Sequence, residues 1–188
     1  MPPATSRAAE GFDRRSFTVA EITAMQDAGI LDETENFELI EGEIIPMNPK
    51  YHAHEAIKSD IGAAMGAALR PGLRIGYETS IFLSPNTFLE PDLCLYPKTI
   101  RSDEVKGADV IVAIEVAAST LRYDRGLKAK IYARYGFREL WVIDANAKRT
   151  FIHRNPIGDG WTSITEHGPD FVLTIPALPD FAIRLDAI

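Results

Sequence analysis

The chain has little cysteine, no long hydrophobic run and no excess of basic residues. Among its 188 residues the one cysteine is Cys94, which excludes an internal disulfide and a zinc site built from several cysteines, and fits a reducing compartment. No apolar stretch approaches the roughly 20 residues that span a bilayer, and the first residues lack the apolar core of a secretory signal. We therefore expect a cytoplasmic protein without a membrane partner.

The charge of the chain is acidic but unevenly spread. A formal net charge of −7 argues against a generic nucleic-acid binder, which usually has a basic excess. Residues 122–138 nevertheless carry one acid, Asp124, and six basic residues, a net charge of +5. These basic residues are Arg122, Arg125, Lys128, Lys130, Arg134 and Arg138. The segment is either a basic patch or the solvated face of a helix.

The N-terminal half contains signals for two helices and several strands. We expect a flexible leader over 1–16 and a single domain over 17–188, since 46% hydrophobic residues suffice for one core. Thr18 and Glu21 have the spacing of a capping box. The expected elements are a helix over 19–28, a hairpin over 37–47, a helix over 52–69, and strands over 74–83 and 91–96.

The C-terminal half begins with VIVAIEVA, residues 110–117, which is apolar on both faces like a central strand. Asp124 can cap a helix that ends near Tyr135, with Leu127, Ile131 and Tyr135 as its buried stripe. Strands over 139–145 and 149–155 and short strands from WTSITE and FVLTIP follow. A strand–helix–strand crossover over 110–145, with hairpins before and after it, predicts an α/β domain with a mixed sheet.

Glu115 is an acid inside the apolar strand VIVAIEVA. An ionised carboxylate buried there needs a cation, a metal or hydrogen bonds. The benign explanation is that Glu115 lies near the end of the strand and points into a crevice, which is also where ligands bind in α/β sheets. Asp92 stands directly after a proline at the start of another apolar strand. Together the two carboxylates are a minimal ligand set for Mg²⁺ or Mn²⁺.

Lys128 follows Glu115 in the next predicted helix, which must pack back across the sheet. Its ammonium group would stabilise charge on a phosphate or lower the pKa of an attacking water. The alternative is an ordinary exposed lysine of a helix. The order of the three residues, rather than any one of them, indicates a site.

That order resembles the PD-(D/E)XK nuclease superfamily, and the chain as a whole resembles the bacterial putative restriction endonuclease family that is abundant in cyanobacteria. The resemblance covers roughly residues 17–155. The residues that carry it are FELIEGE at 37–43, His54, Pro91-Asp92, Ile114-Glu115-Val116, Tyr123-Asp124-Arg125, Lys128, Tyr132-Ala133 and ELWVID at 139–144.

The resemblance implies a restriction-endonuclease-like core, with a central mixed sheet flanked by helices and an added N-terminal helix and hairpin. It also implies that Asp92 and Glu115 hold a divalent metal. The superfamily lysine usually lies two residues after the glutamate, where this chain has Ala117. The chain resembles superfamily members in which the lysine has moved to the following helix. Lys128 occupies the matching position, and Lys130 is the substitute should Lys128 face solvent.

Three other residues have weaker claims to a role. His54 would orient water, contact phosphate or only end a helix. Glu38 matches a recurrent acid of the family and either reaches the metal or pairs with a basic residue. Cys94 shares a strand face with Asp92 and is better explained by packing.

The function expected from the sequence is Mg²⁺- or Mn²⁺-dependent hydrolysis of DNA phosphodiester bonds by Asp92, Glu115 and Lys128. We expect a homodimer and no organic cofactor. One alternative is a catalytically silent binding or regulatory domain with the same fold, which the acidic pI and the relocated lysine favour. The other is a structural domain in which both acids make internal hydrogen bonds.

Overall fold

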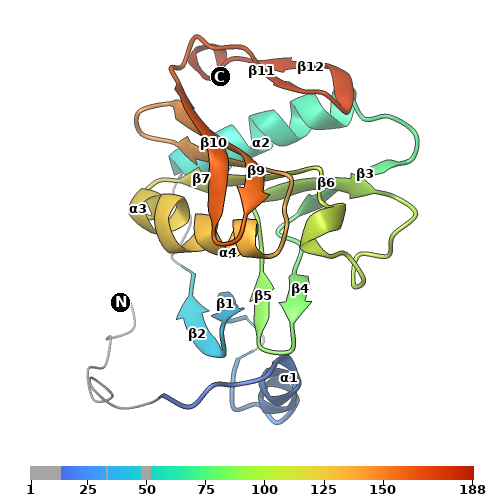
Figure 1. Cartoon of the computed structure of the whole chain (residues 1–188), viewed down its shortest axis with the longest axis vertical. Coiled ribbons are helices and arrows are strands. Elements are labelled where there is room, and N and C mark those ends of the chain that lie inside the picture. The colour runs from blue at the N-terminus through green and yellow to red at the C-terminus, as the bar shows by residue number, and fades with distance from the viewer. Residues whose placement is uncertain (1–13, 33, 48–51) are drawn as a thin grey trace. The chain divides into compact units, whose positions relative to one another are not determined.

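The computed structural model describes residues 14–32, 34–47 and 52–188, and the chain divides into two compact units (Figure 1). The first unit comprises Met1–Pro49 and Phe82–Glu90, and the second comprises Lys50–Ile81 and Pro91–Ile188. Most of the expected leader, residues 1–13, lies outside the described part. A single domain over 17–188 stays a prediction. No helix of the described residues is long and apolar enough to cross a bilayer.

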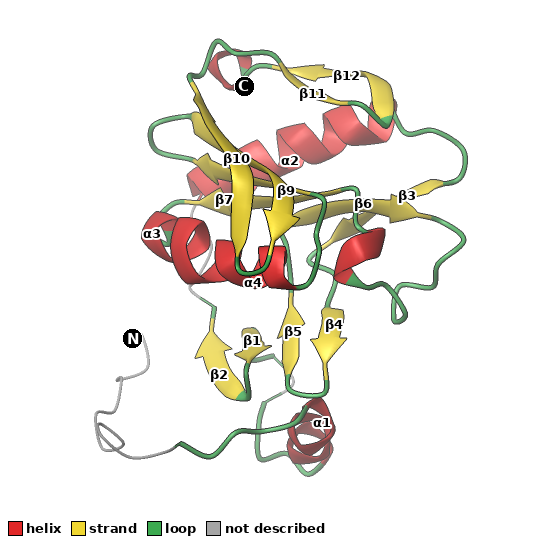
Figure 2. Cartoon of the chain, in the orientation of Figure 1, coloured by secondary structure: helices red, strands yellow, loops and turns green. Residues whose placement is uncertain are grey.

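The first unit is a helix with a four-stranded sheet, as drawn in Figure 2. It contains α1 (Val19–Asp27), β1 (Phe37–Ile40), β2 (Glu43–Pro46), β4 (Ile81–Ser84) and β5 (Thr87–Leu89), with the strand order β2-β1-β5-β4. The capping box of Thr18 and Glu21 is present, which confirms the predicted helix start. The predicted hairpin is also confirmed, and its turn residues Glu41 and Gly42 have φ of 52° and 84°, as a tight primed turn requires.

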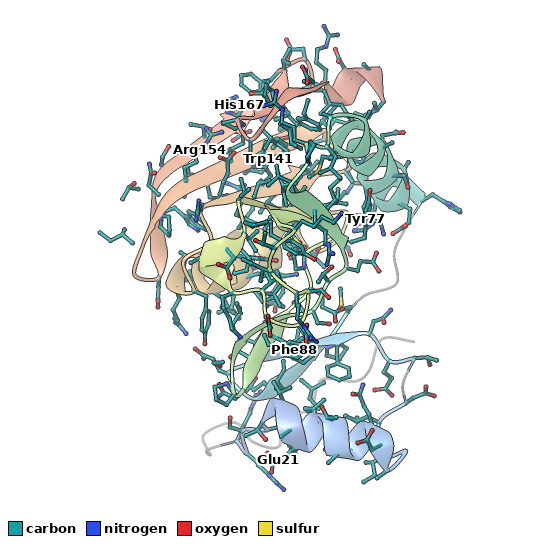
Figure 3. All side chains as sticks on the ribbon, turned by 90° about the vertical axis from the view of Figure 1, so that its right-hand side faces the viewer. Glu21, Tyr77, Phe88, Trp141, Arg154 and His167 are labelled. Carbon is teal, nitrogen blue, oxygen red and sulfur yellow. The ribbon has the colours of Figure 1, made fainter. Side chains whose placement is uncertain are left out.

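Aromatic packing fills the core of the first unit. The Phe88 ring, labelled in Figure 3, has its centroid 5.9 Å from that of Phe37 and 5.7 Å from that of Phe82. Ile22 of α1 and Leu39 of β1 belong to the same buried cluster. Burial of such side chains contributes about 1.5–3 kcal/mol each, so this unit has a core of its own.

The second unit is built on a six-stranded mixed sheet. Its strands are β3 (Leu73–Tyr77), β6 (Leu93–Pro97), β7 (Val112–Ala117), β8 (Glu139–Asp144), β9 (Arg149–Ile157) and β10 (Gly160–His167), in the order β10-β9-β8-β7-β6-β3. The pair β7–β8 is parallel and its neighbours are antiparallel. The predicted crossover over 110–145 and the predicted mixed α/β sheet are therefore confirmed.

Helices cover the two faces of this sheet. The helical elements are α2 (His52–Ala67), η1 (Gly107–Asp109), α3 (Leu121–Tyr123), the π-helix η2 (Asp124–Lys128), α4 (Ala129–Arg134) and η3 (Leu185–Ala187). Two further strands, β11 (Leu173–Ile175) and β12 (Leu178–Ile183), form a separate antiparallel pair. Ile57 and Ile61 of α2 pack with Leu93, Ile114 and Phe181 in the main core. Figure 1 shows α2 on one side of the sheet and α3 and α4 on the other.

The expected strand over 74–83 is wrong as a single element. It is divided between β3 of the six-stranded sheet and β4 of the four-stranded sheet. The break falls at Glu78, whose φ is 46°, a left-handed value that an extended strand cannot contain. The Glu78 N–H donates to the Asp92 carbonyl at 3.2 Å, so this break ties β3 to the beginning of β6.

The expected helix from Asp124 to Tyr135, with Leu127 on its buried stripe, needs two corrections. The helical segment begins at Leu121, with Thr120 as its N-cap residue, so Asp124 lies inside it. Leu127 is 51% exposed, whereas Asp124 and Lys128 are 5% and 4% exposed. The reason is the π turn: the Ala129 N–H donates to the Asp124 carbonyl, and this wider turn changes which side chains face the sheet.

Candidate active site

Asp92 directly precedes β6 and lies next to Glu115 of the adjacent strand β7. Leu93 of β6 pairs with Ile114 of β7, so the antiparallel register places Asp92 across from Glu115 on the same face. Pro91 has no N–H to continue the ladder. Instead, Oδ2 of Asp92 accepts the Val116 N–H at 2.8 Å. The two acids that the sequence predicted as a pair are thus brought together at the end of the β6–β7 ladder.

Glu115 forms an ion pair with Lys128, the lysine expected from the sequence at the same site. Lys128 Nζ lies 2.9 Å from Glu115 Oε1, and the two side chains are only 5% and 6% exposed. The Tyr132 hydroxyl donates to the same oxygen. Lys128 therefore points at the sheet rather than at solvent, while Lys130, the substitute, is exposed. A buried carboxylate in the strand VIVAIEVA is explained by an ammonium group and a phenol that converge on it.

The helical segment supplies these partners through residues four positions apart. Asp124, Lys128 and Tyr132 are all buried, and Asp124 Oδ2 accepts the Thr120 hydroxyl at 2.5 Å. The π turn spans Asp124 to Lys128. Such turns are rare and concentrate at functional sites. Because of this turn, the charged side chains of Asp124 and Lys128 face the sheet, where an apolar stripe was expected.

His54 reaches Asp92 from the first turn of α2. Its Nε2 lies 3.0 Å from Asp92 Oδ2, and its Nδ1 lies 3.1 Å from Glu55 Oε1. Burial alone would lower the pKa of His54, but the hydrogen bonds and charges of Asp92 and Glu55 raise it above the ordinary value. Because both ring nitrogens face carboxylate oxygens, the protonated ring, with an N–H on each nitrogen, suits this place. Contact with Asp92 was not among the roles expected for His54 from the sequence, and those roles stay predictions.

Cys94 is buried in β6 and is not a reactive group at neutral pH. Burial raises the pKa of its thiol to about 12, and the thiolate is the nucleophilic form. We expect the native protein to react with a thiol-specific reagent at pH 8 at least about 100-fold more slowly than a free cysteine. The rate is measured from the absorbance that appears when the thiol reacts with dithiobis(nitrobenzoate). The chain unfolded in urea, in which Cys94 is accessible, is the control. Rapid native labelling would contradict the burial.

The donor set fits a magnesium-type ion better than a zinc-type ion. In the described ranges 14–32, 34–47 and 52–188, no three His, Cys, Asp or Glu side chains form a group that could hold a metal. Two carboxylates nevertheless match Mg²⁺, which is bound by one or two carboxylates and completes its shell with water and substrate phosphate. Among the described residues, both side-chain hydrogen bonds of Asp92 fall on Oδ2, so Oδ1 is the oxygen that could take a ligand.

Comparison with known proteins agrees with this fold. Residues 19–186 match the model of the family described as Putative restriction endonuclease, Uma2. The chain belongs to the Uma2 family. A solved structure of a putative nuclease belonging to DUF820, from Anabaena variabilis, is similar with a TM-score of 0.71 and 18% identity, over 90% of this chain and 96% of that chain. Among curated proteins no match was found. The predicted family and fold class are confirmed.

Several residues of this Uma2 site were not singled out from the sequence. Lys58 contacts Glu55 of the His54–Glu55 pair and also Glu78. Tyr132 was named only among the residues that carry the family resemblance. The four-residue spacing of Asp124, Lys128 and Tyr132 is a signal that could have identified the inward face. Glu38 lies in the first unit, where its Oε1 accepts the Glu90 N–H at 2.9 Å. A role for Glu38 in metal binding stays a prediction.

Proposed function

We propose that the protein is a metal-dependent endonuclease that hydrolyses DNA phosphodiester bonds. The Uma2 family and the likeness to a nuclease fold support nuclease activity. The observation that carries the proposal is the buried pair of Lys128 and Glu115, 2.9 Å apart, beside Asp92 on the neighbouring strand. A homodimer belongs to the same proposal, because two copies of the chain would present one site to each DNA strand.

Asp92 and Glu115 are the residues that would hold Mg²⁺ or Mn²⁺ in this proposal. When bound, such an ion polarises the phosphate and acidifies water for attack on phosphorus. The chain contributes the fixed placement of both carboxylates: the Val116 N–H holds Asp92, and the Tyr132 hydroxyl holds Glu115. Preorganised ligands of this kind need little rearrangement during the reaction.

Lys128 would stabilise the charge that develops on the phosphate. An ammonium group carries three N–H donors and no acceptor, so it can donate to Glu115 and to a substrate oxygen at once. Its near-complete burial strengthens this interaction, since charges interact more strongly where water is excluded. Tyr132 acts through Glu115, whose orientation it fixes.

The basic segment 122–138 would bind the DNA backbone. Lys128 is buried against Glu115, and Arg134 pairs with Asp159 at 2.7 Å. Five basic residues of the segment are exposed, namely Arg122, Arg125, Lys130, Arg138 and the paired Arg134. Affinity from such phosphate contacts falls steeply with salt and is largely independent of sequence.

A silent DNA-binding domain is the second candidate, and one observation favours it. Each acid of the site already has protein partners: Asp92 Oδ2 accepts from His54 and Val116, and Glu115 Oε1 accepts from Lys128 and Tyr132. The charges are thus compensated without an ion. Salt-sensitive DNA binding without cleavage in Mg²⁺ or Mn²⁺ would establish this alternative.

The decisive experiment replaces Asp92 by asparagine. We expect plasmid DNA to be cleaved in Mg²⁺ or Mn²⁺, cleavage to stop in chelator, and Asp92→Asn to lower the rate by about 100-fold, because even a lost outer-shell partner of a metal ligand costs up to that factor. Gel analysis of supercoiled and linear DNA measures the rate. Asp180→Asn, an exposed position of β12, is the matched control. Cleavage that persists in chelator or in Asp92→Asn would refute the proposal.

A further inference from the structure

We propose that His54 is a positioning residue that fixes the Asp92 carboxylate for a bound divalent ion. The inference rests on the proposed function, because it assigns His54 a part in preparing the metal ligand. Within the described residues, the ring nitrogens of His54 contact Asp92 and Glu55, and His54 contacts the pair of acids through Asp92. Its effect on an ion would therefore pass through Asp92.

His54 is one member of a closed ring of interactions around the start of β6. His54 Nε2 contacts Asp92 Oδ2 at 3.0 Å, and His54 Nδ1 contacts Glu55 Oε1 at 3.1 Å. Lys58 Nζ donates to Glu55 Oε1 at 2.8 Å and also to Glu78 Oε1. The ring closes through the backbone, where the Glu78 N–H donates to the Asp92 carbonyl at 3.2 Å.

The charges alternate around this ring. Carboxylates of Asp92, Glu55 and Glu78 are separated by the imidazole of His54 and the ammonium of Lys58, so each cationic group lies between two acids. Burial alone would lower the pKa of Lys58, but Glu55 and Glu78 raise it, while Lys58 lowers the pKa of Glu55. Every charge in the ring thus has an opposite neighbour, and His54 is held from its outer side by Glu55.

Two donors from different elements determine the orientation of Asp92. His54 comes from α2 and Val116 from β7, and both donate to Oδ2. A carboxylate held at one oxygen by two donors at an angle cannot rotate freely, so Oδ1 keeps one direction. Partners that hydrogen-bond to a ligating carboxylate contribute about 10–100-fold to metal affinity. His54 can orient Asp92 in this way because its own ring is held by Glu55, which Lys58 holds in turn.

Two amide substitutions separate the two nitrogen contacts of His54. The amide nitrogen of glutamine occupies the place of Nε2, whereas that of asparagine occupies the place of Nδ1. His54→Gln therefore keeps a donor toward Asp92 and loses the one toward Glu55, and His54→Asn does the reverse. We expect His54→Asn to weaken the binding of Mn²⁺ alone by about 10–100-fold, and His54→Gln to restore most of the affinity.

Calorimetric titration of the full chain with Mn²⁺ measures this, with thermal unfolding of both variants to show that each is folded. Equal Mn²⁺ affinities for His54→Asn and the unaltered chain overturn the inference, and so does equal weakening by both substitutions. Measuring Mn²⁺ binding by Asp92→Asn distinguishes a wrong role for His54 from a wrong metal site. If Asp92→Asn binds Mn²⁺ as tightly as the unaltered chain, the metal site itself is wrong. If only Asp92→Asn weakens binding, the metal site stands and the role of His54 is wrong.

Discussion

Lys128→Met is expected to lower the rate of metal-dependent DNA cleavage by about 10³-fold, the upper range for removing one preorganised donor from a site. Methionine has a similar length and no charge, so it keeps the volume beside Glu115 and removes only the ammonium group. The loss should appear in kcat rather than KM, because the charge on the phosphate that Lys128 would stabilise grows in the transition state.

Lys130→Met is the matched control for Lys128→Met. Both lysines belong to the same helical segment and the same basic stretch, but Lys130 is exposed and Lys128 is buried against Glu115. Lys130→Met should change kcat little and should weaken DNA binding only at low salt. Single-turnover cleavage of a labelled duplex measures both effects. A loss confined to Lys130→Met would transfer the role to the substitute and refute the assignment.

The residues of the candidate site could be predicted from the sequence better than the backbone conformation that brings them together. Glu115 was singled out because a buried acid needs compensation. Asp92 and Lys128 were proposed from their order relative to Glu115 and from the family resemblance, and the structure places both beside it. The sequence also indicated the parallel crossover from β7 to β8, since apolar strands flank one helical segment. These parts depend on pattern and chemistry, which a single sequence contains.

The parts that were missed depend on where the backbone departs from regular geometry. The break at Glu78 follows from a positive φ at a residue type that gives little warning of it. The π turn at 124–128 left Leu127 exposed and turned Lys128 inward, and no propensity distinguishes it from an α-helix. The ring through His54, Lys58 and Glu78 joins three segments and required the tertiary structure. Side-chain networks of this kind are long-range features that periodicity cannot reveal.

The free energy of unfolding should fall by about 3–5 kcal/mol in Lys128→Met, because removing one member of a buried ion pair leaves an uncompensated charge. Glu115 would keep the Tyr132 hydroxyl but lose its cation while only 5% exposed. Urea unfolding measures the change. The same measurement shows whether Lys128→Met loses cleavage because the ammonium group is gone or because the protein is partly unfolded.

The double variant Glu115→Gln with Lys128→Met separates stability from activity. A glutamine oxygen still accepts from Tyr132, and no buried charge remains, so we expect it to recover about 2 kcal/mol relative to Lys128→Met, within the range for directly coupled residues. Cleavage should stay absent, because the variant lacks a proposed metal ligand and the ammonium group. The same cycle at the exposed pair Arg134–Asp159 should show much weaker coupling, since solvent screens it. Additive effects at Glu115 and Lys128 would mean that the buried pair is not formed, and the site would then lack the contact on which the proposed chemistry depends.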